Sequence, residues 1–302
     1  MNKARIIYNP TAGRESFTKE LPIVLQRFEE AGYETSAHAT TGEGDATKAA
    51  EYAVREKFDL VVIVGGDGTI NEAIHGIAEA NERPSLGIIP AGTTNDFARA
   101  LMIPRNTEKA VDIILDNQQK SLDVGKVNDK YFINIAGGGD LTELTYDVPS
   151  KLKTVLGQLA YYIKGIEMLP SIRPQFTKIE YDGEIFEDEI MLFLVANTNS
   201  VGGFEKLAPD AELNDGYFDL IILRKVNLAE FIRLATLALR GAHLEDENVI
   251  YTRAKRIIVT PQNKMQLNID GEYGGLLPGE FINLKQHINF FVPKQFVGEE
   301  DS

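Results

Sequence analysis

Strand-like and helix-like segments alternate over the first 125 residues of the chain. The segments ARIIYNP, YETSAHAT, DLVVIVGG and SLGIIP are predicted to be strands. Between them, apolar residues recur at helical spacing in ESFTKELPIVLQRFEEAG, DATKAAEYAVREKF, the segment from about Ile70 to Asn81, and NTEKAVDIILDN. We expect the first helix to end at Gly32, the second to have Asp45 as its N-cap, and the fourth to begin at Asn106 or Thr107. This alternation predicts a mostly parallel sheet covered by helices on both faces, which binds ligands at the carboxyl ends of its strands.

The pattern changes from about Lys120, where short strand-like runs at close spacing follow one another. KSLDVGKVNDKYFINIAGGG is typical of a hairpin whose tight turn is Asn128-Asp129. Further strands are expected in TKIEYDG, EIFEDEIMLFLVANT, GYFDLIILRK, RIIVTPQ, MQLNIDGEY and FINLKQHINFFVP, and helices in KLKTVLGQLAYYIKGIEML and NLAEFIRLATLALRG. The predicted fold is α/β with two domains, an α/β domain at residues 1–125 and a mostly antiparallel β-sandwich or open barrel at residues 126–295. Residues 296–302 are expected to form an acidic tail. The prediction also admits an arrangement in which the last C-terminal residues pack on the first domain.

Composition narrows the classes of chemistry. The 302 residues include no cysteine, which excludes disulfides, thiolate nucleophiles and cysteine zinc sites, and the four histidines are scattered without metal-ligand spacing. The net charge of -14 argues against a nucleic-acid partner, because the phosphate backbone would be repelled. The apolar run at the N-terminus is too short for a signal peptide. Apolar runs such as Ile190 to Val195 are far shorter than the roughly 18 residues of a membrane span. We therefore expect a cytoplasmic protein whose contact with membrane is peripheral.

The segment VVIVGGDGTINEAIHG, Val61 to Gly76, has the pattern of a strand, a glycine turn and the start of a helix. It is not a dinucleotide fingerprint, because Asn71 stands where the third glycine is required, and no Gly-Lys-Ser/Thr tripeptide of a P-loop occurs in the chain. The backbone amides of the turn and the Thr69 hydroxyl could cradle phosphate oxygens. The alternative is a tight turn in which Asp67 and Thr69 cap the helix.

Two further loops follow strands of the same predicted sheet, Asn9-Pro10-Thr11-Ala12-Gly13 and Gly92-Thr93-Thr94-Asn95-Asp96. All three loops could open at one edge of the sheet and form a phosphate site. An acid such as Asp67 beside phosphates requires a bridging cation, usually Mg2+. Asp96 and Asp123 could complete the acidic group, or they could be a helix cap and a residue of a surface turn.

Five motifs in order along the chain, IIYNPTAG, VGGDGTINE, GIIPAGTTNDFARAL, LDVGK and NIDGEY, resemble the soluble diacylglycerol kinase family of Gram-positive bacteria, within the wider diacylglycerol and sphingolipid kinase group. The resemblance extends from Arg5 to Pro293. It implies transfer of the γ-phosphate of ATP to the hydroxyl of diacylglycerol, which gives phosphatidic acid in phospholipid metabolism. The residues implied to bind ATP are Asn9, Pro10, Thr11, Ala12, Gly13, Thr40, Gly66, Asp67, Gly68, Thr69, Ile70, Asn71, Glu72 and Thr93.

The same resemblance assigns the acids. Asp67, Asp96 and Asp123 would organise the catalytic Mg2+ and its waters, and Glu272 would be the general base. Chemistry agrees for Glu272, because a hydroxyl under phosphorylation loses its proton, and Asp270 and Glu272 share a strand face if that run stays extended. Without the resemblance, NIDGEYGG is better interpreted as an acidic hairpin turn.

A second acidic turn, AELNDGYFDL, matches a structural Mg2+ site of the family, formed by the Asp215 carboxylate and the carbonyl groups of Glu212 and Tyr217. On its own, an Asn-Asp-Gly sequence is far more often a hairpin turn.

A lipid substrate requires contact with an anionic membrane surface, which we expect at the inner face of the membrane. The candidate bases are Arg14, Lys19, Arg99, Arg105, Lys151, Lys153 and Lys164. The apolar face of the helix that carries the last three is expected to pack in the core. Whether the chain forms a homodimer is left open.

Three alternatives remain. An NAD kinase shares the Gly-Gly-Asp-Gly-Thr sequence and a mostly β second domain, but the Asn-Pro-x-x-Gly turn and PAGTTNDFARAL resemble lipid kinases. Another lipid kinase of the same group is the second alternative. A non-catalytic regulator that binds nucleotide or lipid is the third, and the presence of both Asp67 and Glu272 counts against it.

Overall fold

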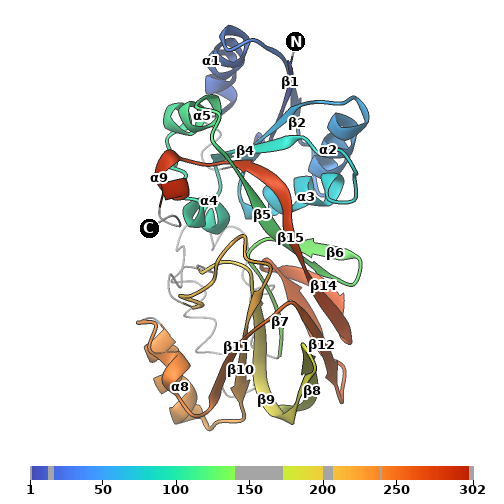
Figure 1. The fold of residues 1–302 in the computed structure, drawn as a ribbon, viewed down its shortest axis with the longest axis vertical. Helices are drawn as coiled ribbons and strands as arrows, with labels where there is room; N and C mark the ends of the chain where they lie inside the picture. The colour runs from blue at the N-terminus through green and yellow to red at the C-terminus, as the bar shows by residue number, and fades with distance from the viewer. Residues whose placement is uncertain (1, 13–16, 140–172, 200–206, 239, 299–302) are drawn as a thin grey trace. The chain divides into compact units, whose positions relative to one another are not determined.

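The computed structural model of the protein describes residues 2–12, 17–139, 173–199, 207–238 and 240–298. The chain divides into two compact units: unit 1 comprises Met1–Leu122 and Gln286–Ser302, and unit 2 comprises Asp123–Lys285. Two strands, β5 (Gln119–Val127) and β15 (Gly279–Phe291), each begin in one unit and end in the other (Figure 1). Unit 2 ends at Lys285, whereas the sequence predicts the end of the second domain at residue 295. The difference arises because the last residues of β15 pair with a strand of unit 1.

Unit 1 is built on a parallel sheet with the strand order β15-β4-β3-β1-β2. Its other strands are β1 (Asn2–Tyr8), β2 (Tyr33–Ala39), β3 (Leu60–Gly65) and β4 (Ser85–Pro90). Its helices are α1 (Phe17–Glu30), α2 (Asp45–Arg55), α3 (Asp67–Ile77), α4 (Asp96–Ala100), α5 (Thr107–Leu115) and α9 (Lys294–Gly298). Figure 1 shows α2 and α3 on one side of the sheet and α1 and α5 on the other. All of β3 is buried, which explains its continuous apolar run.

The helix ends of unit 1 follow local hydrogen bonds. Asn106 is the N-cap of α5, as predicted, and its side chain accepts a hydrogen bond from the Lys109 N–H at 2.9 Å. The prediction that Asp45 caps α2 is wrong, because Gly44 occupies that position in the left-handed conformation. The Asp45 carboxylate instead accepts hydrogen bonds from the Thr41 N–H and hydroxyl, which lower its pKa. Helix α3 begins at Asp67 rather than at Ile70.

Unit 2 is antiparallel, and its strands pair in the order β14-β13-β7-β9-β8-β12-β15, with β10 between β9 and β11. The strands are β6 (Lys130–Phe132), β7 (Ile135–Gly138), β8 (Gln175–Tyr181), β9 (Glu184–Ala196), β10 (Phe218–Arg224), β11 (Val249–Ala254), β12 (Arg256–Pro261), β13 (Gln266–Ile269) and β14 (Glu272–Leu276). The predicted Asn128-Asp129 turn joins β5 to β6, where Val127 pairs with Lys130. The second half of the chain therefore has the predicted antiparallel character.

Aromatic rings fill the core of unit 2. Phe132 stacks on Phe218 at 5.3 Å between ring centroids, and Phe281 contacts both Phe132 and Phe193 edge-on. Helix α8 (Leu228–Ala238) packs Phe231 and Leu234 onto a smaller apolar cluster. A 3-10 helix, η3 (His243–Glu245), follows it.

Candidate active site

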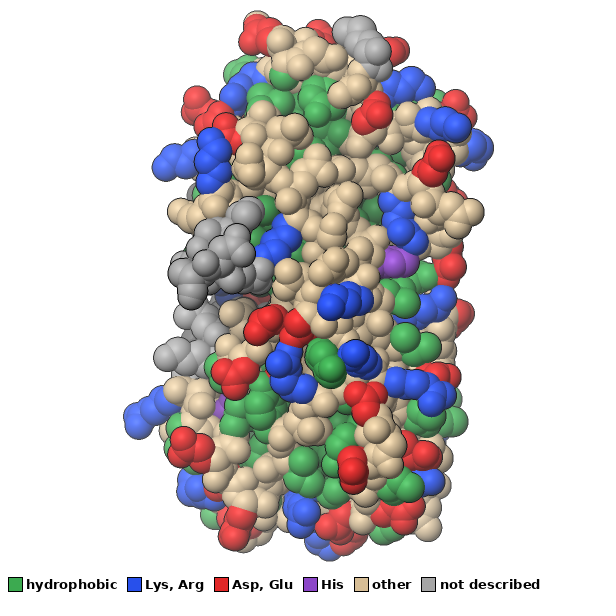
Figure 2. All heavy atoms as spheres, viewed as in Figure 1, with side chains coloured by type: hydrophobic (Ala, Val, Ile, Leu, Met, Phe, Trp, Pro, Cys, Tyr) green, Lys and Arg blue, Asp and Glu red, His purple; other side chains and the backbone are tan. Residues whose placement is uncertain are grey.

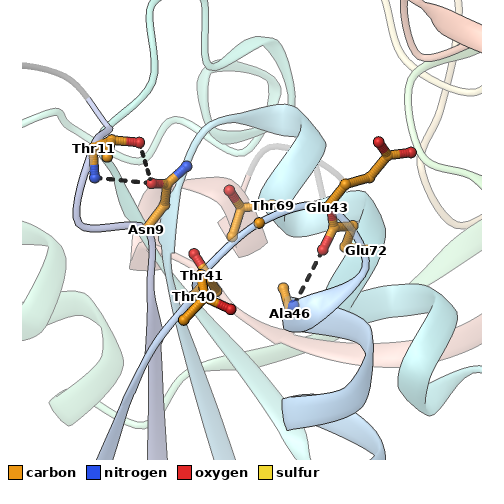
Figure 3. Close-up of a pocket in the computed structure, with 9 residues that line it drawn as sticks. Asn9, Thr11, Thr40, Thr41, Glu43, Ala46, Thr69 and Glu72 are labelled. Atoms are coloured by element: carbon orange, nitrogen blue, oxygen red, sulfur yellow. Dashed lines mark hydrogen bonds between the residues drawn. The ribbon is translucent and has the colours of Figure 1, made fainter.

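A cavity of about 270 Å3 lies in unit 1 at the carboxyl ends of β1, β2 and β3 (Figure 3). Its lining residues are Asn9, Thr11, Thr40, Thr41, Gly42, Glu43, Ala46, Thr69 and Glu72. Five of these, Asn9, Thr11, Thr40, Thr69 and Glu72, are among the predicted nucleotide-binding residues. The other four were not predicted, and they follow β2 in the sequence TTGEGDA. This sequence is a threonine and glycine turn after a strand, the same pattern by which the other phosphate-binding loops were predicted. The structure thus gathers hydroxyl groups from three strand ends around one cavity.

The turn after β1 is held by the side chain of its first residue. Asn9 Oδ1 accepts hydrogen bonds from the Thr11 N–H at 2.9 Å and from the Thr11 hydroxyl at 2.8 Å (Figure 3). The Ala12 N–H donates to the Asn9 carbonyl, so Pro10 lies within a closed turn. Gly13 and Arg14 lie outside the described residues.

Glu72 links helices α3 and α2 beside the cavity. Its Oε2 accepts a hydrogen bond from the Ala46 N–H at 3.1 Å, in the first turn of α2 (Figure 3), and its carbonyl accepts one from the Thr47 hydroxyl. A carboxylate at this position satisfies a helix N–H group that has no partner within the helix. Glu72 therefore fixes the wall of the cavity.

The carboxylate of Asp67 binds the start of helix α4 rather than its own helix. Asp67 Oδ2 accepts hydrogen bonds from the Thr94 hydroxyl and the Asp96 N–H, both at 3.1 Å, and Oδ1 accepts one from the Phe97 N–H at 3.0 Å. The idea that Asp67 caps α3 is wrong, because the N-cap of α3 is Gly66. The acid in the glycine turn thus takes the position of an anion at the N-terminus of another helix.

The loops after β3 and β4 are in direct contact through glycines. A Cβ atom built on Gly92 would lie 2.4 Å from the Cα atom of Gly66, so position 92 has no room for a side chain, and one built on Gly66 would lie 3.1 Å from the Cα atom of Gly92. Asn95, in the left-handed conformation, closes the second loop by accepting from the Gly92 N–H at 2.8 Å and donating to the Gly92 carbonyl at 2.9 Å. The glycine contact and the hydrogen bonds of Asp67 therefore join the two loops.

The remaining predicted residues of α3 differ in exposure. Gly68 is exposed and Asn71 is half-buried, with its carbonyl 3.0 Å from His75 Nδ1. The Ile70 side chain is fully buried, and its N–H donates to the Gly66 carbonyl. Ile70 thus contributes to the core of unit 1.

Asp96 and Arg99 form an ion pair within α4. Arg99 Nη1 lies 3.3 Å from Asp96 Oδ1, and Arg99 Nη2 donates to the Thr94 carbonyl at 2.8 Å. The Arg99 side chain retains 37% of its exposure, whereas that of Asp96 retains 10%. Arg99, which was predicted to contact the membrane, is therefore already bound to two oxygens of its own loop.

Asp123 lies in unit 2 and is fully buried, which excludes a surface turn. Its Oδ2 accepts a hydrogen bond from the Gly216 N–H at 2.6 Å, and its N–H donates to the Leu213 carbonyl at 2.7 Å. Asp123 thus anchors the turn that contains Asp215.

The carboxylate of Asp215 is bound on both oxygens by groups of unit 2. Oδ1 accepts a hydrogen bond from the Tyr217 N–H at 2.8 Å, while the buried Oδ2 contacts the Arg253 guanidinium without the geometry of a hydrogen bond. The Tyr217 carbonyl accepts from Asn283 Nδ2 at 3.1 Å. In the described part of the chain, no three acidic or histidine side chains are grouped closely enough to hold a metal ion by themselves. A cation here would need the Glu212 and Tyr217 carbonyls, and it would compete with Arg253.

Both basic and acidic groups lie near this turn, and the Arg253 guanidinium and the Lys255 ammonium group lie over the Tyr217 ring. Burial raises the pKa of Asp219 to about 6, and the charges of Asp210 and Glu212 add to the rise. Tyr251 donates a hydrogen bond to Asp219, and its own pKa is raised by burial and by that carboxylate.

Asp270 and Glu272 have separate positions, so the expectation that they share an extended strand face is wrong. Asp270 and Gly271 have positive φ angles of 48° and 90° and form the turn between β13 and β14. The Asp270 carboxylate accepts hydrogen bonds from the N–H groups of Ile133, Asn134 and Ile135, each at 2.9 Å. Glu272 is exposed at the first position of β14. Asp270 therefore stabilises the turn through these hydrogen bonds, whereas the Glu272 side chain is exposed to solvent.

Basic and acidic side chains are interspersed on the face of the molecule drawn in Figure 2. Of the bases predicted to meet the membrane, Lys19 is exposed on α1, while Arg14 and Lys164 lie outside the described residues, as do Lys151 and Lys153. None of the helices in the described ranges has the length and apolar character needed to cross a membrane.

The chain thus combines a parallel α/β unit, with threonine and glycine loops at its strand ends, and an antiparallel unit. Residues 3–127 match the family model described as the diacylglycerol kinase catalytic domain, and residues 144–292 match the YegS C-terminal NAD kinase beta sandwich-like domain. The chain belongs to the diacylglycerol kinase family. Both the predicted family and the predicted α/β and β-sandwich fold are confirmed.

The relatives cover the whole chain. A diacylglycerol kinase of Bacillus subtilis (strain 168) is 66% identical over 98% of both chains, and one of Staphylococcus haemolyticus (strain JCSC1435) is 54% identical over 98% of this chain and 90% of its own. A crystal structure of a diacylglycerol kinase from Bacillus anthracis str. Sterne has a TM-score of 0.78 at 27% identity over 98% of both chains. A second structure from that organism has a TM-score of 0.84 at 29% identity, over 98% of this chain and 96% of the other.

Proposed function

We propose that the protein is a diacylglycerol kinase that transfers the γ-phosphate of ATP to the hydroxyl of diacylglycerol and so forms phosphatidic acid. The observation that carries the proposal is the pair of glycine loops joined at Gly66 and Gly92 beside the threonine-lined cavity, in a chain of this family. Backbone N–H groups and hydroxyls at strand ends are the donors that bind phosphate oxygens. NAD kinase is disfavoured by the full-length identity to diacylglycerol kinases.

The acids of unit 1 suit a hydrated Mg2+. A carboxylate has about four lone-pair positions, and three donors already occupy those of Asp67, so one position remains for a cation or its water. Mg2+ usually keeps several waters and bridges phosphates, whose developing charge it neutralises when bound. We assign Asp67 and Asp96 to the orientation of these waters. Asp123, the third predicted acid, lies in unit 2, where its buried carboxylate holds the Asp215 turn through the Gly216 N–H. Asp67 also positions the Thr94 hydroxyl, which ties the loop after β4 to the same carboxylate.

The turn at Asp215 is proposed as a second, structural Mg2+ site. Its donors would be the Asp215 carboxylate and the carbonyl groups of Glu212 and Tyr217. The buried Oδ2 without a hydrogen bond supports a cation at this turn. In the metal-free protein Arg253 supplies the positive charge.

Glu272 is proposed as the general base. A base must reach the attacking hydroxyl, so its side chain has to be accessible, and Glu272 is exposed. Asp270 holds the turn from which Glu272 extends through its three backbone hydrogen bonds. The proposed role of Asp270 is to position Glu272, and Glu272 would accept the proton of the diacylglycerol hydroxyl.

Diacylglycerol lies in the membrane, so we propose that the protein acts at the inner face of the membrane as a peripheral protein. Lys19, with Arg14 and Lys164, is the proposed basic contact to anionic lipid, while Arg99 is bound within its own loop. Light scattering of the purified protein distinguishes a monomer from a homodimer.

The function is tested with purified protein, radiolabelled ATP and mixed micelles that contain diacylglycerol and anionic lipid. Label should enter phosphatidic acid in the presence of Mg2+. The acceptors compared in parallel are sphingosine, monoacylglycerol and NAD. Turnover of NAD equal to that of diacylglycerol, or transfer to no lipid at all, would exclude the proposed activity.

A further inference from the structure

Two arginines bind the carbonyl oxygens of the loop after β4. Arg105 Nη2 donates to the Thr93 carbonyl at 2.6 Å and to the Thr94 carbonyl at 3.2 Å, while Arg99 Nη2 donates to the Thr94 carbonyl. We propose that Arg105 is a positioning residue that orients the backbone N–H groups of this loop toward the phosphates of ATP. The proposal rests on the proposed function, because it assumes that the loop binds ATP phosphate.

The orientation follows from the planarity of the peptide group. In a trans peptide, the carbonyl of one residue and the N–H of the next point in opposite directions. When Arg105 holds the Thr93 and Thr94 carbonyls on its side, the Thr94 and Asn95 N–H groups must face the other side of the loop. Within the described ranges, these two N–H groups have no hydrogen-bond acceptor. They are therefore available to phosphate oxygens, which two successive amides bind well.

The rest of the loop is fixed from within unit 1 by other groups. Asn95 closes the loop onto Gly92, and Asp67 binds the Thr94 hydroxyl and the Asp96 N–H. Neither of these interactions holds the Thr93 carbonyl. Arg105 holds it from outside the loop, in the segment between α4 and α5. Loss of Arg105 would let the Thr93–Thr94 peptide rotate while the loop ends stay in place.

Arg105 is well suited to substitution because it is exposed and lines a second cavity of about 580 Å3 rather than the core. Its replacement should leave the packing of unit 1 intact. Grouping Arg105 with the bases that contact lipid would require a free guanidinium. Two carbonyl dipoles already hold one of its nitrogens, which favours a role inside the protein.

The test compares Arg105→Ala and Arg105→Lys with a matched control, Arg83→Ala. Arg83 also binds two carbonyls of unit 1, those of Ala78 and His287, but neither belongs to a phosphate loop. Binding of a fluorescent ATP analogue is measured with Mg2+ and without lipid, so this readout does not depend on the lipid acceptor. Arg105→Ala should bind about tenfold more weakly, as expected for loss of a charge-assisted hydrogen bond, with Arg83→Ala within about twofold of wild type. Arg105→Lys should recover part of the affinity, since its ammonium group keeps a positive charge and hydrogen-bond donors but stands on a shorter side chain than Nη2.

In turnover assays the KM for ATP should rise in Arg105→Ala while the KM for diacylglycerol stays unchanged. Sedimentation with vesicles of phosphatidylglycerol and phosphatidylcholine should not change. Unchanged affinity for the ATP analogue, an equal loss in Arg83→Ala, or a defect confined to vesicle binding would each overturn the assignment. If wild-type protein binds the analogue but phosphorylates no lipid, the proposed function fails while the role of Arg105 is still decided by the binding data.

Discussion

Replacement of Asp67 by alanine should destabilise the metal-free protein as well as inactivate it. The variant removes the acceptor of three hydrogen bonds at the start of α4, two of which come from backbone N–H groups. Phe97 is fully buried and Asp96 is 7% exposed, so water cannot easily replace the lost acceptor. A metal ligand without a structural role would give the opposite result, because its removal relieves repulsion among acids when the metal is absent.

The magnitude can be worked from these contacts. Loss of a helix cap costs about 1 kcal/mol, and each buried donor left without an acceptor costs about 1 to 3 kcal/mol. These contributions overlap, so we expect the free energy of unfolding of unit 1 to fall by about 3 kcal/mol. For a chain of this size, each kcal/mol lowers the thermal midpoint by about 2 to 4 °C, which gives a decrease of about 6 to 12 °C.

The assay is differential scanning calorimetry in EDTA, followed by turnover measurements with Mg2+. The control is Asp112→Ala, which removes an exposed ion pair with Arg27 in the same unit and should lower the free energy of unfolding by less than about 1 kcal/mol. An Asp67→Ala protein that is as stable as wild type in EDTA would refute the capping role. Near-normal turnover in the same variant would refute the catalytic role.

Three further outcomes are expected. Glu272→Gln should abolish transfer without changing the thermal midpoint or the affinity for ATP. Asp270→Ala should lower the thermal midpoint, because three backbone N–H groups lose their acceptor. Equal midpoints in the two variants would contradict a structural role for Asp270 and a catalytic role for Glu272. MgCl2 should raise the thermal midpoint of wild type, by binding the folded state, more than that of Asp215→Asn, and equal shifts would argue against the structural site. Burial lowers the pKa of His243, so this side chain is protonated less readily in the folded protein than in the unfolded chain. The contribution of His243 to stability should therefore be present near pH 7.5 and lost as the pH falls toward 5.5. His243→Gln should flatten this decline in urea denaturation, and parallel pH profiles would contradict it.

The local pattern of the sequence was enough to place the strands and the loops. β3 is an unbroken apolar run because it lies in the centre of a parallel sheet, and the glycine loop after it follows from the change of period at Gly65. The ends of helices were less predictable. Asp45 has the composition of an N-cap, but Gly44 takes that position since it can adopt the left-handed conformation.

The hydrogen-bond partners of individual acids could not be predicted from the local pattern, because those partners are far away in the sequence. Asp67 binds N–H groups 29 and 30 residues away, which meet it only because β3 and β4 are neighbours. Asp270 binds the segment that begins at Ile133, at a separation of 137 residues. The sequence NIDGEYGG offers two carboxylates, and the pairing of β13 with β7 brings that of Asp270 to the backbone N–H groups of Ile133, Asn134 and Ile135.

Strand β15 has a consequence for how the chain is made. Its last residues complete unit 1, where Phe290 pairs with Leu86 and packs edge-on against Phe97 at 5.2 Å between ring centroids. The Val292 N–H then donates to the Gln118 carbonyl. A ribosome therefore synthesises the first 122 residues long before the strand that covers their sheet edge emerges. The nascent first unit must wait, with the side of β4 open, until almost the entire polypeptide has been translated, and a fragment that stops near residue 125 should aggregate for the same reason.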